Sequence, residues 1–248
     1  MPVRFRASLI HLAFSLGIAL LAGCLVFGVW FPGDYRRFSG GTELFTLIVS
    51  VDVVLGPLLT LVVFNVRKPR AEIVRDLAVV GVLQLSALLF GVHTMYVARP
   101  VALVHEVDRF RVVAANQVYS APSATDEARL SMTGPKLLSA RRPAPAESIA
   151  AAELALQGYD IGQRPEFWQP YEAGRALAIE RALPLSLWVA QHPGEGAELK
   201  QRLVASGVDP SRARFSPLIA RSADWIVVLD DQGRVTSFAA GGEQIRAP

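Results

Sequence analysis

A single carboxylate inside an apolar run is the residue of this chain whose position most suggests chemistry. Asp52 lies near the middle of Leu44–Phe64, a run of about 21 residues that carries no other charge. That length is enough to cross a hydrocarbon core of about 30 Å. An ionised side chain at such a depth costs roughly 2.5–3.5 kcal/mol on insertion scales. Asp52 is therefore either hydrogen-bonded to a neighbouring helix or directly involved in function, and the sequence leaves both possibilities open.

Residues close to Asp52 indicate more than a plain membrane anchor. Gly56 and Pro57 follow one turn later, and a proline inside a helix is expected to kink it. Since a carboxylate that faces lipid would be costly, we expect Asp52 to face the next apolar helix near Gln84 and Ser86. Gly56 is expected to allow close approach of another helix backbone.

Other residue types that commonly carry out chemistry are scattered. The four histidines, at positions 11, 93, 105 and 192, form no motif, and Cys24, the only cysteine, excludes an intrachain disulfide and a cysteine metal cluster. Asp230 and Asp231 fall in a predicted turn, where acidic residues are common. No zinc-protease, nucleophile-elbow or phosphate-binding motif is present. The residues thus predict no catalytic group, metal or cofactor, and the net charge of +3 without a basic block favours no nucleic-acid partner.

The composition requires membrane segments. Hydrophobic residues make up 52% of the 248 residues and charged residues 19%, which is too apolar for one soluble domain. Besides the run around Asp52, Leu9–Trp30 and Leu77–Ala98 are long enough to span a bilayer. Leu21–Cys24 has the form of a lipoprotein cleavage site, but the apolar run continues to Trp30, so we expect an uncleaved helix.

Loop charges predict the orientation in the membrane. The loop Asn65–Asp76 carries Arg67, Lys68, Arg70 and Arg75. Because positive loops stay in the cytoplasm, the N-terminus is expected inside and everything after Arg99 outside. The predicted organisation is a three-helix transmembrane domain over residues 1–99 and an external domain over residues 100–248.

The external part has the pattern of a small α+β domain. Val101–Val113 predicts a hairpin with a two-residue turn at Asp108-Arg109, and Trp225–Phe238 predicts a second hairpin. The stretch Ser120–Pro145 is rich in Pro, Ser and Ala and predicts a long loop. Helices are expected over 147–157, 172–183 and 195–206, and a strand over 185–189. The aromatic residues Phe167, Trp168 and Tyr171 form either part of the core or a docking patch for a partner.

Several stretches resemble the TfpX/TfpZ family of type IV pilin accessory proteins. The matching residues are Gly40-Gly41-Thr42, Leu44-Phe45, Val51-Asp52, Leu55–Asn65, Lys68, Arg75-Asp76, Gln84, Ala98–Val101 and Glu106–Phe110, with weaker matches at Thr133–Pro135 and Arg164-Pro165. The main resemblance covers about residues 30–115. A membrane helix that combines Asp, Gly and Pro in this order is unusual, which makes the match specific.

The resemblance implies a multi-pass protein of the bacterial inner membrane, with a periplasmic C-terminal domain, that assists type IV pilus biogenesis. Its implied partner is a type IV pilin, besides the lipid bilayer itself and a possible second copy of the chain. We expect Asp52, Gly56 and Pro57 to contact the pilin in the membrane, and Phe167, Trp168 and Tyr171 to contact it outside. The alternatives are a membrane sensor with a ligand-binding periplasmic domain and an enzyme or transporter that works at Asp52.

Overall fold

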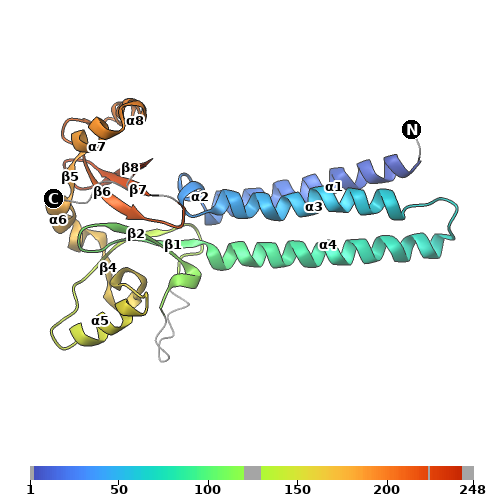
Figure 1. The fold of residues 1–248 in the computed structure, drawn as a ribbon, viewed down its shortest axis with the longest axis horizontal. Coiled ribbons are helices and arrows are strands. Elements are labelled where there is room, and N and C mark those ends of the chain that lie inside the picture. Colours follow the sequence, from blue (N-terminus) through green and yellow to red (C-terminus); the bar gives the residue numbers. More distant parts are fainter. Residues whose placement is uncertain (1–2, 120–129, 223, 242–248) are drawn as a thin grey trace. The chain divides into compact units, whose positions relative to one another are not determined.

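The computed structural model describes residues 3–119, 130–222 and 224–241, and it divides into two compact units, Met1–Arg99 and Pro100–Pro248 (Figure 1). The first unit contains three helices whose length and apolar composition are sufficient to cross a membrane. The second unit is built on a mixed β-sheet with helices. The predicted order, three apolar helices followed by a sheet-containing domain, is therefore confirmed.

The helices of the first unit extend beyond the predicted apolar runs. Helix α1 covers Val3–Leu25 and continues as a π-helical turn, η1, over Val26–Trp30. Helix α3 covers Gly41–Val63 and α4 covers Arg70–Ala98. The segment between α1 and α3 contains the one-turn helix α2 at Tyr35–Phe38. Polar residues at the ends of α1 and α4 continue the helix, because backbone hydrogen bonds do not depend on apolar side chains.

Helix α3 packs against both α1 and α4. The Ser8 hydroxyl of α1 donates a hydrogen bond to the carbonyl oxygen of Pro57 at 2.9 Å. On the side of α4, a Cβ atom added to Gly91 would lie 2.6 Å from the Ile48 side chain, so this glycine allows close contact between α3 and α4. Both contacts hold neighbouring helices at α3, which is the central element of the unit.

Helices α1 and α4 meet at one end of the unit. Val26, Trp30, Phe31 and Met95 form a buried cluster. The rings of Trp30 and Tyr96 make a T-shaped contact with centroids 5.5 Å apart. Aromatic pairs prefer this arrangement. The cluster therefore closes the three-helix unit at the C-terminal ends of α1 and α4.

The second unit contains a sheet with strand order β4-β3-β1-β2-β6-β7-β8, and β5 pairs with β6. Its strands are β1 Pro100–His105, β2 Phe110–Ala114, β3 Lys136–Ala140, β4 Trp168–Pro170, β5 Leu183–Pro184, β6 Arg214–Ile219, β7 Trp225–Leu229 and β8 Val235–Ala240. The pairs β1–β3 and β2–β6 are parallel, and the other pairs are antiparallel. Non-sequential parallel pairs place residues from distant parts of the chain side by side.

Helices accompany this sheet. They are α5 Ser148–Leu156, α6 Tyr171–Arg181, α7 Leu185–Gln191 and α8 Pro193–Ala205, with short 3-10 turns η2 Ala115–Gln117, η4 Ile161–Gln163 and η5 Pro165–Phe167. One buried cluster joins α7 and α8 to β6, β7 and β8, around Trp188 and Phe215. A second cluster joins β1, β2 and β3 to α5, around Val104 and Phe167. Both clusters bury apolar side chains and stabilise the domain.

Comparison with the sequence-based expectations shows both agreement and error. The two hairpins and the three predicted helices of the domain are present. The first hairpin does not turn at Asp108-Arg109 alone, because β1 ends at His105 and the loop Glu106–Arg109 is closed by a bond from the Glu106 N–H to the Arg109 carbonyl. The predicted long loop contains β3, and part of that prediction, residues 120–129, lies outside the described residues. The predicted strand 185–189 is wrong, since it is helix α7, with Leu185 and Trp188 buried three residues apart on one helical face.

Candidate functional site

The side chain of Asp52 forms no hydrogen bond with α4 in the part of the chain that the structure describes. Gln84 donates its side-chain amide to the backbone carbonyl of Asp52 at 3.1 Å, and Ser86 is exposed. Among the residues that the structure describes, none donates a hydrogen bond to the buried Asp52 Oδ1. Asp52 and Gln84 do line one cavity, as expected, but the Gln84 amide lies against Gly56, one turn along α3, and from there it bonds to the Asp52 carbonyl instead of the carboxylate.

The Asp52 carboxylate instead lines a cavity of about 170 Å³ between α1, α3 and α4. His11 and Phe14 line it from α1, and Gly81 and Leu85 line it from α4. Sequence reasoning missed His11 as a neighbour of Asp52, since the two residues lie 41 positions apart with no shared motif. The cavity combines one carboxylate and one imidazole with mostly apolar walls.

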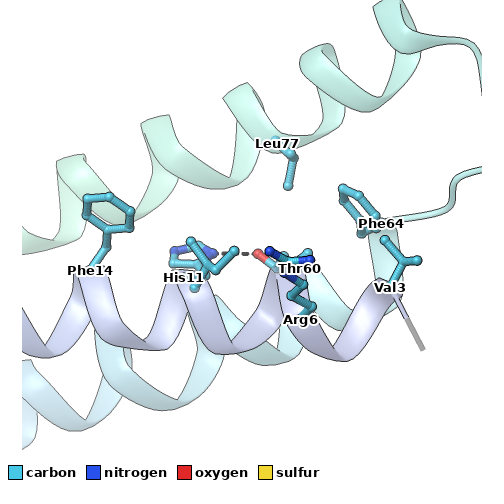
Figure 2. A pocket seen from close by; sticks show the side chains of 9 residues that line it. Val3, Arg6, His11, Phe14, Thr60, Phe64 and Leu77 are labelled. Atoms are coloured by element: carbon cyan, nitrogen blue, oxygen red, sulfur yellow. Dashed lines mark hydrogen bonds between the residues drawn. The ribbon is translucent and has the colours of Figure 1, made fainter. Parts of the chain in front are cut away.

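A second and larger cavity, of about 700 Å³, adjoins the first one (Figure 2). His11 and Phe14 line both cavities, while Arg6, Phe64 and Leu77 line only the larger one. In Figure 2 the His11 ring is hydrogen-bonded through Nδ1 to the Thr60 hydroxyl of α3. We call the two cavities together the membrane groove. Its larger part lies toward the end of the unit opposite to the Trp30 and Tyr96 cluster, where Val3 and Phe64 line it.

Gly56 and Pro57 lie inside the three-helix unit. Both are buried, and α3 runs through them from Gly41 to Val63 as one helical segment. A Cβ atom added to Gly56 would lie 2.0 Å from Gln84 Nε2, and the carbonyl of Pro57 accepts the Ser8 hydroxyl. Gly56 thus permits the contact with α4 and Pro57 the contact with α1. Of the three membrane residues proposed for partner contact, only Asp52 lines a cavity among those found.

The aromatic segment of the second unit belongs largely to its core. Phe167 and Tyr171 are 1% and 2% exposed, and Trp168 is half-buried. The Tyr171 hydroxyl donates to the Gly233 carbonyl at 2.7 Å, and burial raises the pKa of Tyr171 to about 12. Trp168 Nε1 donates to the Gly162 carbonyl at 2.8 Å. These contacts agree with the core alternative for this segment, with Trp168 as its more accessible member.

Two arginines, Arg141 and Arg164, make cation–π contacts with the Phe167 ring. The guanidinium carbon of Arg141 lies 4.8 Å from the ring centroid, and that of Arg164 lies 4.6 Å from it. Arg141 also forms a two-bond pair with the Glu147 carboxylate, at 2.7 and 2.9 Å. Arg141 and the N–H of Ala144 hold the pKa of Glu147 down to about 2. Cation–π contacts and ion pairs together connect β3, the start of α5 and η5.

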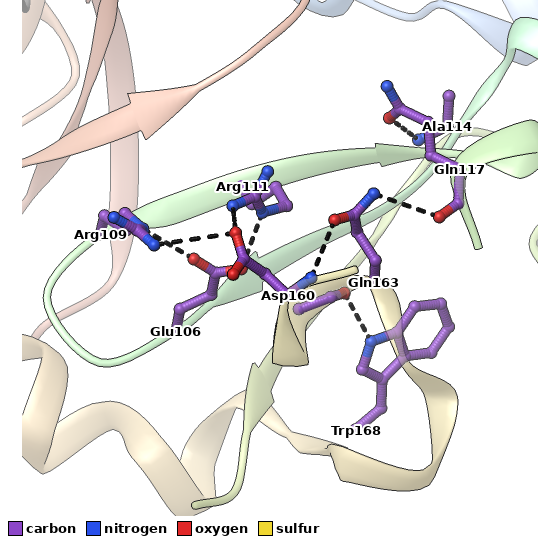
Figure 3. A network of polar contacts seen from close by, with 9 residues as sticks. Glu106, Arg109, Arg111, Ala114, Gln117, Asp160, Gln163 and Trp168 are labelled. Atoms are coloured by element: carbon purple, nitrogen blue, oxygen red, sulfur yellow. Dashed lines mark hydrogen bonds and ion pairs between the residues drawn. The ribbon is translucent and has the colours of Figure 1, made fainter. Parts of the chain in front are cut away.

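A polar network joins the first hairpin to η4 (Figure 3). Glu106, which is 3% exposed, accepts hydrogen bonds from Arg109 Nε at 2.8 Å and from Arg111 Nε at 2.7 Å. Arg111 also pairs with Asp160. A Cβ atom on Gly162 would lie 2.4 Å from Glu106 Oε1, so η4 packs directly on the carboxylate. The network fully pairs a buried charge, which is the condition for tolerating one.

A buried histidine lies beside this network. His105 is 1% exposed, and neither ring nitrogen has a hydrogen-bond partner among the described residues. Burial lowers the pKa of His105 to about 4, although the charge of Asp108 opposes the shift. The ring packs 5.0 Å from that of Phe110. At neutral pH this histidine is therefore an uncharged core residue.

Within residues 3–119, 130–222 and 224–241, no group of three or more His, Cys, Asp or Glu side chains is placed so that it could hold a metal ion. Cys24 lies exposed on α1, within the helix rather than after it. What the described residues do provide is the membrane groove with Asp52 and a sheet domain with buried charged networks. Neither is a known catalytic constellation, and both are suited to holding helices and strands in place.

Comparison with known proteins identifies relatives over nearly the whole chain. The family model for the fimbrial assembly protein FimB matches residues 1–40. The fimbrial assembly protein of serogroup I from Dichelobacter nodosus is 34% identical over 238 residues, which cover 94% of this chain and 93% of the relative. The serogroup E1 protein of the same organism has the same identity and coverage, and the protein of serogroups C1 and C2 is 39% identical over 113 residues, 46% of this chain and 86% of the relative. No solved structure matches this chain. Since the similarity extends across both units, the chain belongs to the family of fimbrial assembly proteins.

Proposed function

We propose that this protein is a non-catalytic accessory protein of the bacterial inner membrane that binds a type IV pilin and assists its assembly into a pilus. The observation that carries the proposal is the similarity to fimbrial assembly proteins over 94% of the chain. The resemblance of residues 30–115 to TfpX/TfpZ pilin accessory proteins supports the choice of the type IV system. In this proposal residues 100–248 lie in the periplasm, since the charged loop between α3 and α4 favours the cytoplasm.

The architecture supports a role that combines two kinds of contact. A bundle of apolar helices provides contacts within the membrane, where packing and polar groups drive association. A separate sheet domain provides contacts outside the membrane. A pilus subunit that is still anchored in the membrane needs both before it is assembled, and one accessory protein with two such units meets that need without a catalytic step.

Deletion of the gene tests the proposal in a piliated strain. We expect pilin to be made at the normal level while surface pili and twitching motility decrease, and full-length wild-type protein should restore both. A Ser50→Ala variant is the matched control, since this exposed hydroxyl bonds only to the Leu47 carbonyl of its own helix. Normal piliation in the deletion strain would reject the proposal. It would favour a sensor instead, which thermal stabilisation of the full-length protein by a small periplasmic ligand would support.

A further inference from the structure

The membrane groove is lined by residues from all three long helices of the first unit. Helix α3 forms its floor, while α1 and α4 form its two walls. At the other end of the unit, contacts between Trp30 and Tyr96 close the walls together. The groove thus extends away from this cluster toward Arg6 and Leu77, and its two parts adjoin because His11 and Phe14 line both.

The floor of the groove contains an acceptor without a donor. Asp52 Oδ1 is buried and receives no hydrogen bond from the residues that the structure describes. Two polar groups nearby form their recorded hydrogen bonds with other atoms, since the Gln84 amide donates to the Asp52 backbone carbonyl and His11 Nδ1 bonds to Thr60. A buried polar atom left without a hydrogen bond destabilises the protein. The site therefore favours an occupant that brings a donor to Asp52.

The surroundings limit what that occupant is. Lipid acyl chains fill apolar space but have no hydrogen-bond donors. A transmembrane helix satisfies its own backbone and can carry a donor on a side chain. The part of the groove at Asp52 has about 170 Å³, several times the roughly 30 Å³ that one water molecule takes in the liquid. This is space for a single side chain, while the adjoining part of about 700 Å³ leaves space for several more side chains from one face of a helix.

We propose that the membrane groove receives one transmembrane helix of a pilus subunit, and that this helix places a hydrogen-bond donor against Asp52. The inference rests on the proposed function for the identity of the partner. It adds the binding site, the element that enters it and the chemistry that recognises it. Apolar contacts with Phe14, Ile18 and Leu85 provide lateral packing, and Asp52 selects a helix with a donor at the matching depth.

Photo-crosslinking in cells tests the location. A photoreactive residue is placed at Phe14 or Leu85, which line the groove, and at Leu16 or Leu83 as matched controls on the same helices. Both control positions are exposed, by 51% and 61%, and line neither cavity. We expect the pilus subunit to be captured from the groove positions and not from the controls. Capture of lipid alone, or of a second copy of this chain, from Phe14 and Leu85 would overturn the inference.

Substitutions in the groove test the chemistry. A Cβ atom on Gly81 meets nothing within 4 Å, so Gly81→Leu fills the groove without a clash, and Gly17→Leu is the matched control because that site is equally open and lines neither cavity. Gly81→Leu should abolish capture from Phe14, whereas Gly17→Leu should not. Asp52→Leu should lower capture by roughly three- to twentyfold, the range for one interhelical hydrogen bond in a membrane, and Asp52→Asn, which keeps an acceptor oxygen, should lower it less.

The outcomes separate this inference from the proposed function. If wild-type protein restores pili to the deletion strain but Gly81→Leu captures the subunit as well as Gly17→Leu does, the protein assists assembly and the groove is not its binding site. Equal capture by wild type and Asp52→Leu would show that the bound helix donates no hydrogen bond to Asp52. Normal piliation in the deletion strain would instead reject the proposed function itself. Membrane levels of every variant are measured in parallel, so that loss of capture is scored per folded molecule.

Discussion

The side-chain amide of Gln84 occupies the space that a side chain on Gly56 would need: a Cβ atom there would lie 2.0 Å from Nε2. From this position the amide donates to the Asp52 carbonyl at 3.1 Å. Gly56 on α3 and Gln84 on α4 therefore form one interhelical contact, which we call the joint. Because Gly56 has no side chain, the Gln84 amide has room to form its hydrogen bond.

This joint predicts a specific mutational coupling. In Gly56→Ala the flexible end of Gln84 has to move away, which breaks its bond to Asp52. We expect the variant to lose about 1 kcal/mol of stability, as does Gln84→Ala. The double variant should lose no more than either single variant, because both remove the same bond. Thermal unfolding of the full-length protein in detergent measures this, with Gly81→Ala as an open-site control. Additive losses would show that the two residues act independently.

Glu106 should be a key residue for the stability of the second unit. Its buried carboxylate pairs with Arg109 and Arg111, and Glu106→Ala leaves the largely buried Arg111 without that partner. Removal of one member of a buried pair costs about 3–5 kcal/mol. Glu172→Ala is the control, since Glu172 is 70% exposed and its pair with Arg175 contributes at most about 1 kcal/mol. Denaturant unfolding of the full-length protein followed by tryptophan fluorescence would measure both, and equal losses would contradict the role of Glu106.

His105 predicts how the stability of the same unit depends on pH. Burial lowers the pKa of His105 to about 4 in the folded state, compared with about 6.5 when unfolded. The unfolded state therefore binds more protons between these values, and stability rises with pH across this window. The loss at pH 4 relative to pH 7 reaches at most about 3 kcal/mol.

Replacement of the ring isolates this contribution. His105→Phe should reduce the slope of stability against pH between about 4 and 6.5, since phenylalanine does not bind a proton. The exposed His93 of the first unit provides the matched control, His93→Phe. Unfolding midpoints of the two variants and the wild type are compared at a series of pH values. A His105→Phe variant with the wild-type slope would show that other groups determine the pH dependence.

The sequence was sufficient for features that depend on local patterns. Long apolar runs predicted the three membrane helices, and alternating apolar residues around turns predicted the hairpins over 101–113 and 225–238. Strand β3 was missed because its partners in the sheet, β1 and β4, lie far away in the chain, whereas β6 was missed although one of its partners, β7, is the next strand. For α7, the run from Leu185 to Val189 is too short for periodicity to separate a strand from a helix, and burial of Leu185 and Trp188 decides it.

The candidate site was predictable only in part. The depth and energetic cost of Asp52 singled it out in the sequence, and in the structure it lines a cavity between the three helices. Its neighbour His11 could not be found, since only the packing of α1 on α3 brings these two residues to one cavity. Gly56 signalled close helix approach, but the sequence could not show that the approaching group is Gln84 of the same chain. Composition predicts that helices associate; packing decides which face remains open.

Cysteine labelling tests the proposed orientation in the membrane. In a Cys24→Ser background, single cysteines are placed at Val66, 60% exposed between α3 and α4, and at Leu156, 90% exposed at the end of α5. If the positive loop stays in the cytoplasm, a membrane-impermeant maleimide should label Leu156→Cys in cells with a permeabilised outer membrane. Val66→Cys should react only after the inner membrane is broken. Ile149→Cys, 79% exposed on α5, is a second periplasmic position and should match Leu156→Cys. Cys24→Ser itself should leave the size of the protein unchanged, because Cys24 lies within α1 and the helical segment continues to Trp30. The reverse labelling pattern would place residues 100–248 in the cytoplasm, where they could not reach the external part of a pilus subunit.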